Sequence, residues 1–130
     1  MTILALDIGS KKTGVAISHG EMAQALITIF IDKTGEKGLI EKINKIISDQ
    51  KVEQLVVGMP LSKDGHQTTQ SALIKGQAQR ISSAVSLPVE FCEETLTSWE
   101  AEEQIGKNRD QIDAQAAKII LEQYLNERRR

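Results

Sequence analysis

The chain has 130 residues, the size of one ordinary domain, so we expect a single domain over residues 1–130 and no separate binding module. Its 40% hydrophobic and 26% charged residues exclude a disordered or collagen-like chain. The net charge of −2 counts against a domain that is basic overall, although clustered lysines and arginines can still attract a polyanion.

The expected compartment follows from what the chain lacks. No apolar run approaches the roughly 18 residues of a membrane span, and the N-terminus lacks the basic region and cleavage site of a signal peptide. Cys92 is the one cysteine, so it cannot form an internal disulfide, which is typical of a reducing compartment. We expect a cytoplasmic protein with no membrane partner.

Three strands are predicted first. Residues 3–8 form an apolar run, residues 9–14 (GSKKTG) supply turn residues, and residues 15–20 resume an extended pattern, as in a hairpin. Ala25 to Ile31 is rich in β-branched residues and predicts the third strand. These strands should be antiparallel.

Helices and strands then alternate. Apolar residues at helical spacing predict a helix over Lys37 to Gln50, and the apolar run over residues 54–59 predicts a buried parallel strand. Residues 60–70 read as a loop. A helix over residues 71–85, a strand over 88–93 and helical segments over 98–105 and 110–127 complete the list.

This order predicts an α/β protein with a mixed five-stranded sheet flanked by helices. Three N-terminal strands would be antiparallel and two further strands parallel. The order is that of the ribonuclease H-like fold.

Asp7 is the only polar residue in the first strand, and Gly9 after it allows a tight turn and the close approach of a ligand. An acid at the end of a strand is suited to binding a ligand. It is equally suited to capping the following turn through backbone amides, so position alone leaves both roles open.

Two further positions carry acids where a shared site would need them. Glu93 and Glu94 end a second parallel strand, and the carboxyl ends of such strands line the ligand crevice of open α/β sheets. Neighbours in a strand point to opposite faces, so at most one should share a site with Asp7. Asp113 lies near the start of the last helix, where the helix dipole alone also favours an acid.

Three converging carboxylates would repel one another unless a cation lay between them. Oxygen ligands suit Mg²⁺ or Mn²⁺ rather than zinc, and such ions promote phosphodiester hydrolysis. The GSKKTG turn offers amides, the hydroxyl of Thr13 and the charges of Lys11 and Lys12 to a phosphate. A solvated hairpin tip is the competing interpretation of that turn.

Four segments together resemble, in order, the motif blocks of the YqgF (RuvX) family of pre-16S rRNA nucleases. They are LALDIGSKKTGVAIS, LVVGMPLSKDG, FCEETLTSWEAE and QIDAQAAKIILEQYL. The resemblance runs nearly end to end. It implies a ribonuclease H-like fold related to Holliday-junction resolvases, a cytoplasmic location, and processing of the 5′ end of pre-16S rRNA in ribosome biogenesis.

The resemblance also implies that Asp7, Glu94 and Asp113 are the catalytic, metal-binding acids. The chain departs from the family's Asp-Glu-Arg-Leu-Thr-Ser motif at Glu93, a conservative change, and at Thr95, which replaces an arginine and loses a bidentate phosphate donor. Lys12 stands where an arginine is common.

We therefore hypothesise a Mg²⁺- or Mn²⁺-dependent hydrolase acting on pre-rRNA or branched DNA, with Gly9, Lys11, Lys12, Thr13 and Arg80 contacting the nucleic acid. A non-catalytic nucleic-acid or ribosome-assembly factor is a second hypothesis. An actin-like phosphotransferase is disfavoured because such enzymes close two domains of this fold around ATP. The sequence leaves open whether the substrate is RNA or DNA and whether the protein is a monomer or a homodimer.

Overall fold

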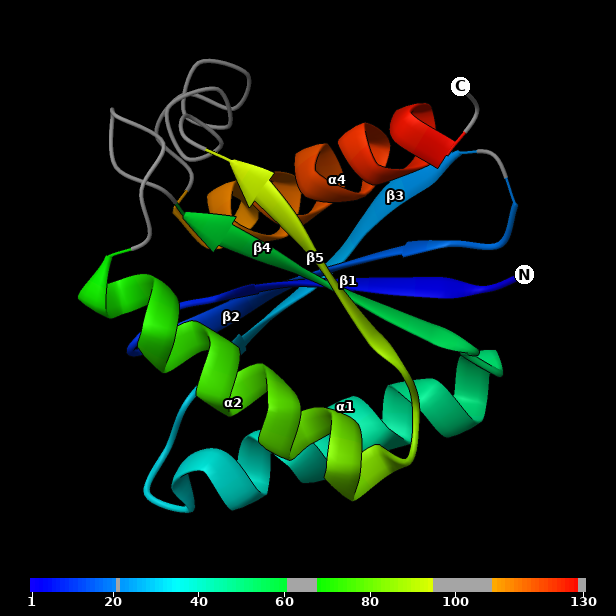
Figure 1. Ribbon diagram of the computed structural model, residues 1–130. Coiled ribbons are helices and arrows are strands. Elements are labelled where there is room, and N and C mark those ends of the chain that lie inside the picture. Colours follow the sequence, from blue (N-terminus) through cyan, green and yellow to red (C-terminus); the bar gives the residue numbers. More distant parts are fainter. Residues whose placement is uncertain (21, 61–67, 95–108, 129–130) are drawn as a thin grey trace.

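A mixed five-stranded sheet forms the centre of the protein (Figure 1). The computed structural model describes residues 1–20, 22–60, 68–94 and 109–128, except for the side chains at 94 and 109–113. The strands are β1 (Ile3–Ile8), β2 (Lys12–Ser18), β3 (Ala23–Phe30), β4 (Gln54–Pro60) and β5 (Val89–Glu94).

The strand order is β3-β2-β1-β4-β5. β1, β2 and β3 pair antiparallel, whereas β4 runs parallel to β1 and β5 runs parallel to β4. The predicted mixed sheet, with three antiparallel N-terminal strands and two further parallel strands, is therefore confirmed.

Helices cover both faces of the sheet. α1 (Gly35–Gln50) and α2 (Thr69–Val85) lie on one face, and α4 (Arg109–Arg128) lies on the other (Figure 1). The segment predicted to be helical over residues 98–105 lies outside the described residues. Within the described ranges, none of the helices is both long and apolar enough to cross a lipid bilayer.

The alternation of side chains along each strand divides the apolar interior into two cores. Leu4, Leu6 and Ile8 of β1 belong to the core beneath α1 and α2. Ile3 and Ala5 belong to the core beneath α4. By the same alternation Asp7, the next odd-numbered residue of β1, falls on the α4 face.

The first hairpin is tighter than predicted. β2 begins at Lys12 rather than at residue 15, because the β1–β2 ladder continues to the pair Ile8–Thr13. The backbone N–H of Gly9 donates to the carbonyl of Lys12 at 2.9 Å. A Cβ at Gly9 would lie only 2.7 Å from that carbonyl oxygen, so this turn requires glycine.

Candidate active site

Asp7 lies near the carboxyl end of β1 and is half-buried. It stands opposite Gly14 in the antiparallel ladder with β2. On the other side, the parallel pairing of β1 with β4 ends at Leu6 and Val57, one residue earlier. Asp7 therefore stands just beyond the place where β1 and β4 stop pairing.

The sheet changes direction at this place. β2 follows β1 on one side as a hairpin, whereas β4 joins on the other side after α1 as a parallel strand. In open α/β sheets such a switch point leaves a crevice outside the carboxyl ends of the strands. Asp7 therefore stands at the mouth of such a crevice, close to the hairpin turn that begins at Gly9.

Glu94 is the last residue of β5, and the ladder between β4 and β5 pairs it with Pro60. Its side chain lies outside the described residues. Because β1, β4 and β5 are parallel, Glu94 ends its strand at the same edge of the sheet as Asp7.

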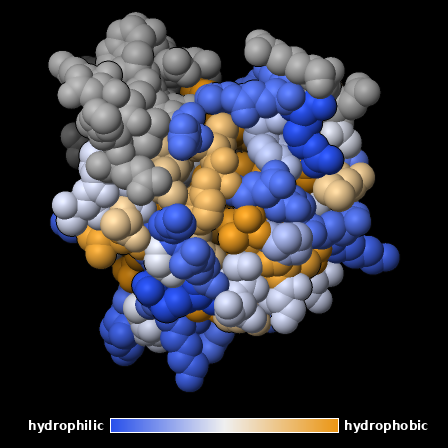
Figure 2. Space-filling view, in the orientation of Figure 1, coloured by the Kyte–Doolittle hydropathy of each residue, from blue (hydrophilic) through white to orange (hydrophobic). Residues whose placement is uncertain are grey.

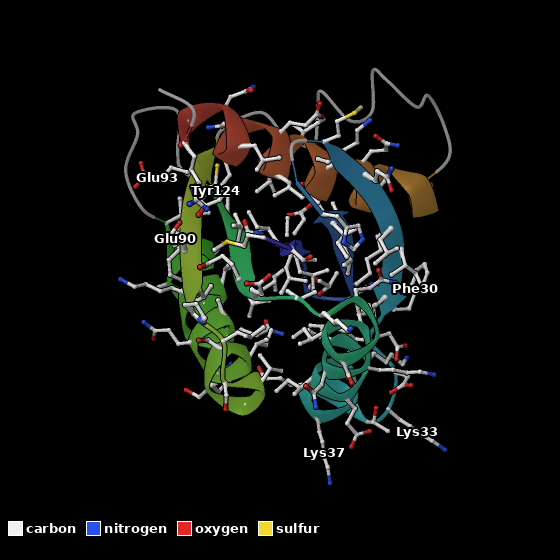
Figure 3. All side chains as sticks on the ribbon, turned by 90° about the vertical axis from the view of Figure 1, so that its right-hand side faces the viewer. Phe30, Lys33, Lys37, Glu90, Glu93 and Tyr124 are labelled. Carbon is white, nitrogen blue, oxygen red and sulfur yellow. The ribbon has the colours of Figure 1, made fainter. Side chains whose placement is uncertain are left out.

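Glu93 belongs to a different surface. Glu90 accepts a hydrogen bond from the Tyr124 hydroxyl of α4 (Figure 3). Cys92 also belongs to the α4 core, so strand alternation points Glu93 away from that core, at the exposed edge of β5. There it lines a cleft of about 470 Å³ with Met59, Phe91, Lys75 of α2 and Glu127. Figure 2 shows apolar surface in the middle of this side of the molecule, bordered by hydrophilic residues.

α4 is held against the sheet at Gly58 of β4. A Cβ at Gly58 would overlap Ile120 Cδ1, so only a glycine lets Ile120 pack at this depth. Ala114, Ala116 and Ala117 of α4 are buried as well, and their small side chains let the helix lie close to the sheet.

The direction of α4 brings its first turns to the edge that carries Asp7. Arg128, at the end of the helix, contacts Met1 at the start of the chain, and Ile120 lies over Gly58. The N-terminal turns therefore lie beside the carboxyl end of β4 (Figure 1). Asp113 is the fifth residue of this helix, and its side chain lies outside the described residues.

The described side chains alone do not form a metal site. Among them no group of three histidine, cysteine, aspartate or glutamate residues could hold a metal ion. Of the three predicted acids, only the side chain of Asp7 is described.

The basic hairpin residues stand at the same edge. Lys11 is exposed, and the Lys12 ammonium lies 5.9 Å from the centre of the Phe30 ring. Thr13 is fully buried, and its hydroxyl has no hydrogen-bond partner within the part of the chain that the structure describes. Thr13 faces the α1 and α2 core with Ile8 and Val15, so it does not share a face with Asp7.

Arg80 lies in the other layer of the molecule. It is a residue of α2, and its guanidinium binds the Glu36 carboxylate of α1 through both Nε and Nη2, at 2.9 and 2.8 Å. This hydrogen bonding, followed by the ionic attraction, lowers the pKa of Glu36 and raises that of Arg80. The structure does not bring Arg80 to Asp7.

Gly58 and Phe30 are relevant to the site but were not predicted from the sequence. Gly58 seats α4, and a glycine within a predicted strand is a signal of close backbone approach. Phe30 ends β3 beside Lys12 and is half exposed. One of only two phenylalanines, placed at the end of a strand, could have indicated a surface role.

The sheet order and the helices on both faces define a class: this is a ribonuclease H-like domain. Among solved structures, T. thermophilus RuvC in complex with Holliday junction substrate matches 99% of this chain and 96% of its own, with a TM-score of 0.65. Its identity of 14% makes this a likeness of fold.

The family model described as "RuvX: Holliday junction resolvase" matches residues 1–127. Relatives from Gloeothece citriformis and Rippkaea orientalis, each named "Putative pre-16S rRNA nuclease", are both 37% identical to the chain. The matches cover 97% and 99% of this chain, and 88% and 98% of the relatives. The chain belongs to the RuvX family, which places it among nucleases, hydrolases that act on phosphodiester bonds.

Proposed function

We propose that the protein is a divalent-metal-dependent nuclease in which Asp7, Glu94 and Asp113 hold the metal. The observation that carries this proposal is the meeting of three elements at one edge of the sheet. β1 and β5 end there in parallel, and α4 begins there.

The backbone positions support a shared site. β1 and β5 are two strands apart, and the registers put position 94 two residues further along than Asp7. A strand spacing of about 4.8 Å and a rise of about 3.3 Å per residue separate the two backbone positions by roughly 12 Å. Position 94 follows Cys92 by two residues, and Cys92 belongs to the α4 core. Strand alternation thus assigns position 94 to the same face as Asp7.

Helical spacing supports Asp113 as the third metal-binding acid. Positions 113, 117, 120 and 124 recur every three or four residues, and the last three are buried against the sheet. Position 113 continues this stripe by one turn. It stands about 10 Å along the helix axis from the contact between Ile120 and Gly58, toward the carboxyl ends of the strands.

The donor set fits a hard cation. Carboxylates gathered in a half-buried crevice repel one another, and oxygen ligands favour Mg²⁺ or Mn²⁺. When bound, such ions lower the pKa of an attacking water and stabilise the leaving oxygen of a phosphodiester.

The protein's own groups orient the substrate. The ladder with β2 fixes Asp7 opposite Gly14, and the tight turn at Gly9 presents the adjoining backbone at the same edge. Lys11 and Lys12 would contact the phosphate backbone beside the scissile bond, where positive charge attracts a polyanion.

We assign pre-16S rRNA as the substrate because the relatives from G. citriformis and R. orientalis are named for it. Cleavage at its 5′ end is what the resemblance of the four sequence segments implies. A branched DNA junction is the second candidate, since the family description names a Holliday junction resolvase.

The test compares the wild type, Asp7→Asn and Asp49→Asn on a pre-16S rRNA fragment and on a four-way DNA junction. Asp49 is an exposed acid near the end of α1, so its variant controls for the loss of one charge. We expect cleavage that needs Mg²⁺ or Mn²⁺, persists in Asp49→Asn and falls more than about 100-fold in Asp7→Asn, since even outer-shell changes cost 10- to 100-fold.

Cleavage in the presence of a chelator, or full activity of Asp7→Asn, would overturn the proposal. Salt-sensitive binding without any product would favour a non-catalytic assembly factor instead. Faster cleavage of the RNA fragment than of the junction would assign pre-16S rRNA as the substrate, and the reverse would assign branched DNA.

A further inference from the structure

Phe30, the last residue of β3, is a large apolar side chain that remains 51% exposed. β3 is an edge strand of the sheet. Two other residues of this strand, Leu26 and Ile27, are also exposed, but only Phe30 is aromatic and only Phe30 stands beside a cation.

The ladder between β2 and β3 holds Phe30 next to the basic hairpin. Phe30 pairs with Lys12 in register, and the Lys12 ammonium lies 5.9 Å from the ring centre. The backbone N–H of Ile31 donates to the carbonyl of Lys11 at 2.9 Å, which ties the end of β3 to the hairpin. The backbone of Phe30 is therefore held beside the hairpin, and its ring lies near the Lys12 ammonium.

Phe30 also lies on the same face of the sheet as Asp7, at the same end of the strands. The register aligns Asp7 with Gly14 and Gly14 with Thr28, so these three residues form one row across the sheet. Lys12 and Phe30 lie two residues further along their strands, which keeps them on the same face. Two strand spacings and two residues of rise separate Asp7 from Phe30 by roughly 12 Å, the length of a few nucleotides.

The charges around Phe30 suit a polyanion. Lys11 precedes Lys12 and Lys33 follows Phe30 by three residues; both are exposed and form no ion pair within the part of the chain that is described. The nearby acids Asp32 and Glu36 pair with Lys42 and Arg80, respectively. Figure 3 shows Phe30 and Lys33 on the side of the molecule away from Glu90 and Glu93.

We propose that Phe30 stacks on an unpaired base of the nucleic acid bound at Asp7, while Lys11 and Lys12 contact the adjoining phosphates. An exposed aromatic ring among lysines is the arrangement that binds single-stranded nucleic acid, because every base has a face that can stack. The identity of the ligand rests on the proposed nuclease function. The substrate would then be a duplex with an unpaired segment that runs from Asp7 toward β3.

The test measures binding of an RNA hairpin with a short unpaired purine tail and of the same hairpin without the tail. A chelator prevents cleavage. Phe30→Ala and Phe30→Leu should weaken binding of the tailed hairpin roughly 5- to 100-fold, the range of one lost base stack. Phe30→Tyr should bind like the wild type, as should Leu26→Ala, which removes another exposed apolar residue of the same strand.

Binding of the hairpin without the tail should be unchanged in all variants. Wild-type affinity of Phe30→Ala for the tailed hairpin would overturn the proposal, and full affinity of Phe30→Leu would reduce the role to apolar contact. A dimer that becomes a monomer in Phe30→Ala, with RNA affinity unchanged, would assign this edge to self-association.

The two proposals fail in different ways. Normal tail binding by the Phe30 variants, with cleavage still dependent on Asp7, overturns only the role of Phe30. Absence of metal-dependent cleavage, with tail binding still dependent on Phe30, overturns only the nuclease proposal.

Discussion

Ile120 of α4 packs directly on the backbone of Gly58 in β4. A Cβ at position 58 would overlap Ile120 Cδ1 and lie 3.1 Å from Ile120 Cγ1. Because Asp113 is two helical turns before Ile120, the depth of this contact sets how closely the N-terminal turns of α4 approach the end of β1.

Gly58→Ala should therefore affect both stability and catalysis. We expect a loss of about 1–3 kcal/mol in the free energy of unfolding, the usual cost of overpacking a core. We also expect cleavage to fall by up to about 100-fold in the folded variant, because a shift of about 1 Å in a catalytic group has that effect. Urea denaturation and single-turnover cleavage measure the two quantities.

Two further variants isolate the contact. Gly20→Ala should be neutral, because a Cβ there meets no atom within 4 Å. Ile120→Val removes the atom that the new methyl group would overlap, so in the double variant it should recover part of the loss, giving a coupling of about 0.5–3 kcal/mol. Strict additivity would mean that Gly58 does not act through Ile120.

Thr13→Val should stabilise the protein by about 1 kcal/mol, because it removes a fully buried hydroxyl that has no hydrogen-bond partner among the described residues. Nucleic-acid binding and cleavage should be unchanged. Thr13→Ser, which keeps the hydroxyl and loses the methyl group, should instead destabilise by about 1 kcal/mol. If Thr13→Val folds but binds nucleic acid more weakly than the wild type, Thr13 contacts the substrate after all.

The fold was predictable because its signals are local. The β-branched residues of β3, the apolar run of β4 and the helical spacing of α1 each specify an element without reference to the rest of the chain. The start of β2 was predicted wrongly because Lys12 and Thr13 resemble turn residues in sequence. Their place in the ladder depends on pairing with β1 and β3.

The candidate site was only partly predictable. Asp7 was recognisable as the single acid of an apolar strand, but the packing of Ile120 on Gly58 joins residues from distant segments. Arg80 shows the same limit, because its positive charge was visible in the sequence while its partner Glu36 lies 44 residues away. A charge count cannot tell a surface ion pair from a phosphate contact.

Arg80→Gln should leave nucleic-acid binding and cleavage unchanged, because Arg80 is engaged with Glu36 on the face opposite α4. Its effect should be a small loss of stability with a defined pH dependence. Arg80 lowers the pKa of Glu36, so the pair's contribution is present above the ordinary glutamate pKa and is lost as pH falls through the lowered value.

Glu36→Gln is the matched control for this pair. This variant should lose the same pH-dependent part of the stability as Arg80→Gln, and the double variant should be no less stable than either single variant. Thermal unfolding from neutral to acidic pH measures these differences. Weaker RNA binding in Arg80→Gln but not in Glu36→Gln would instead assign Arg80 to the substrate.

Tyr124 should titrate at unusually high pH. Burial raises the pKa of its phenol, and the hydrogen bond to Glu90 raises it further. Because Tyr124 is the only tyrosine, the tyrosinate absorbance of the protein reports this group alone. A group whose folded pKa is raised stabilises the protein fully below its unfolded pKa of about 10, and that stability is lost as pH rises toward the folded value.

Tyr124→Phe should lose about 1 kcal/mol near neutral pH, the value of one hydrogen bond to a partly solvated carboxylate, and should lack the alkaline component of unfolding. Glu90→Gln should lower the pKa of Tyr124 without restoring its ordinary value, because burial is the larger cause. A phenol that titrates near 10 in the folded wild type would contradict this account, since it would mean that the end of α4 does not bury Tyr124 against β5.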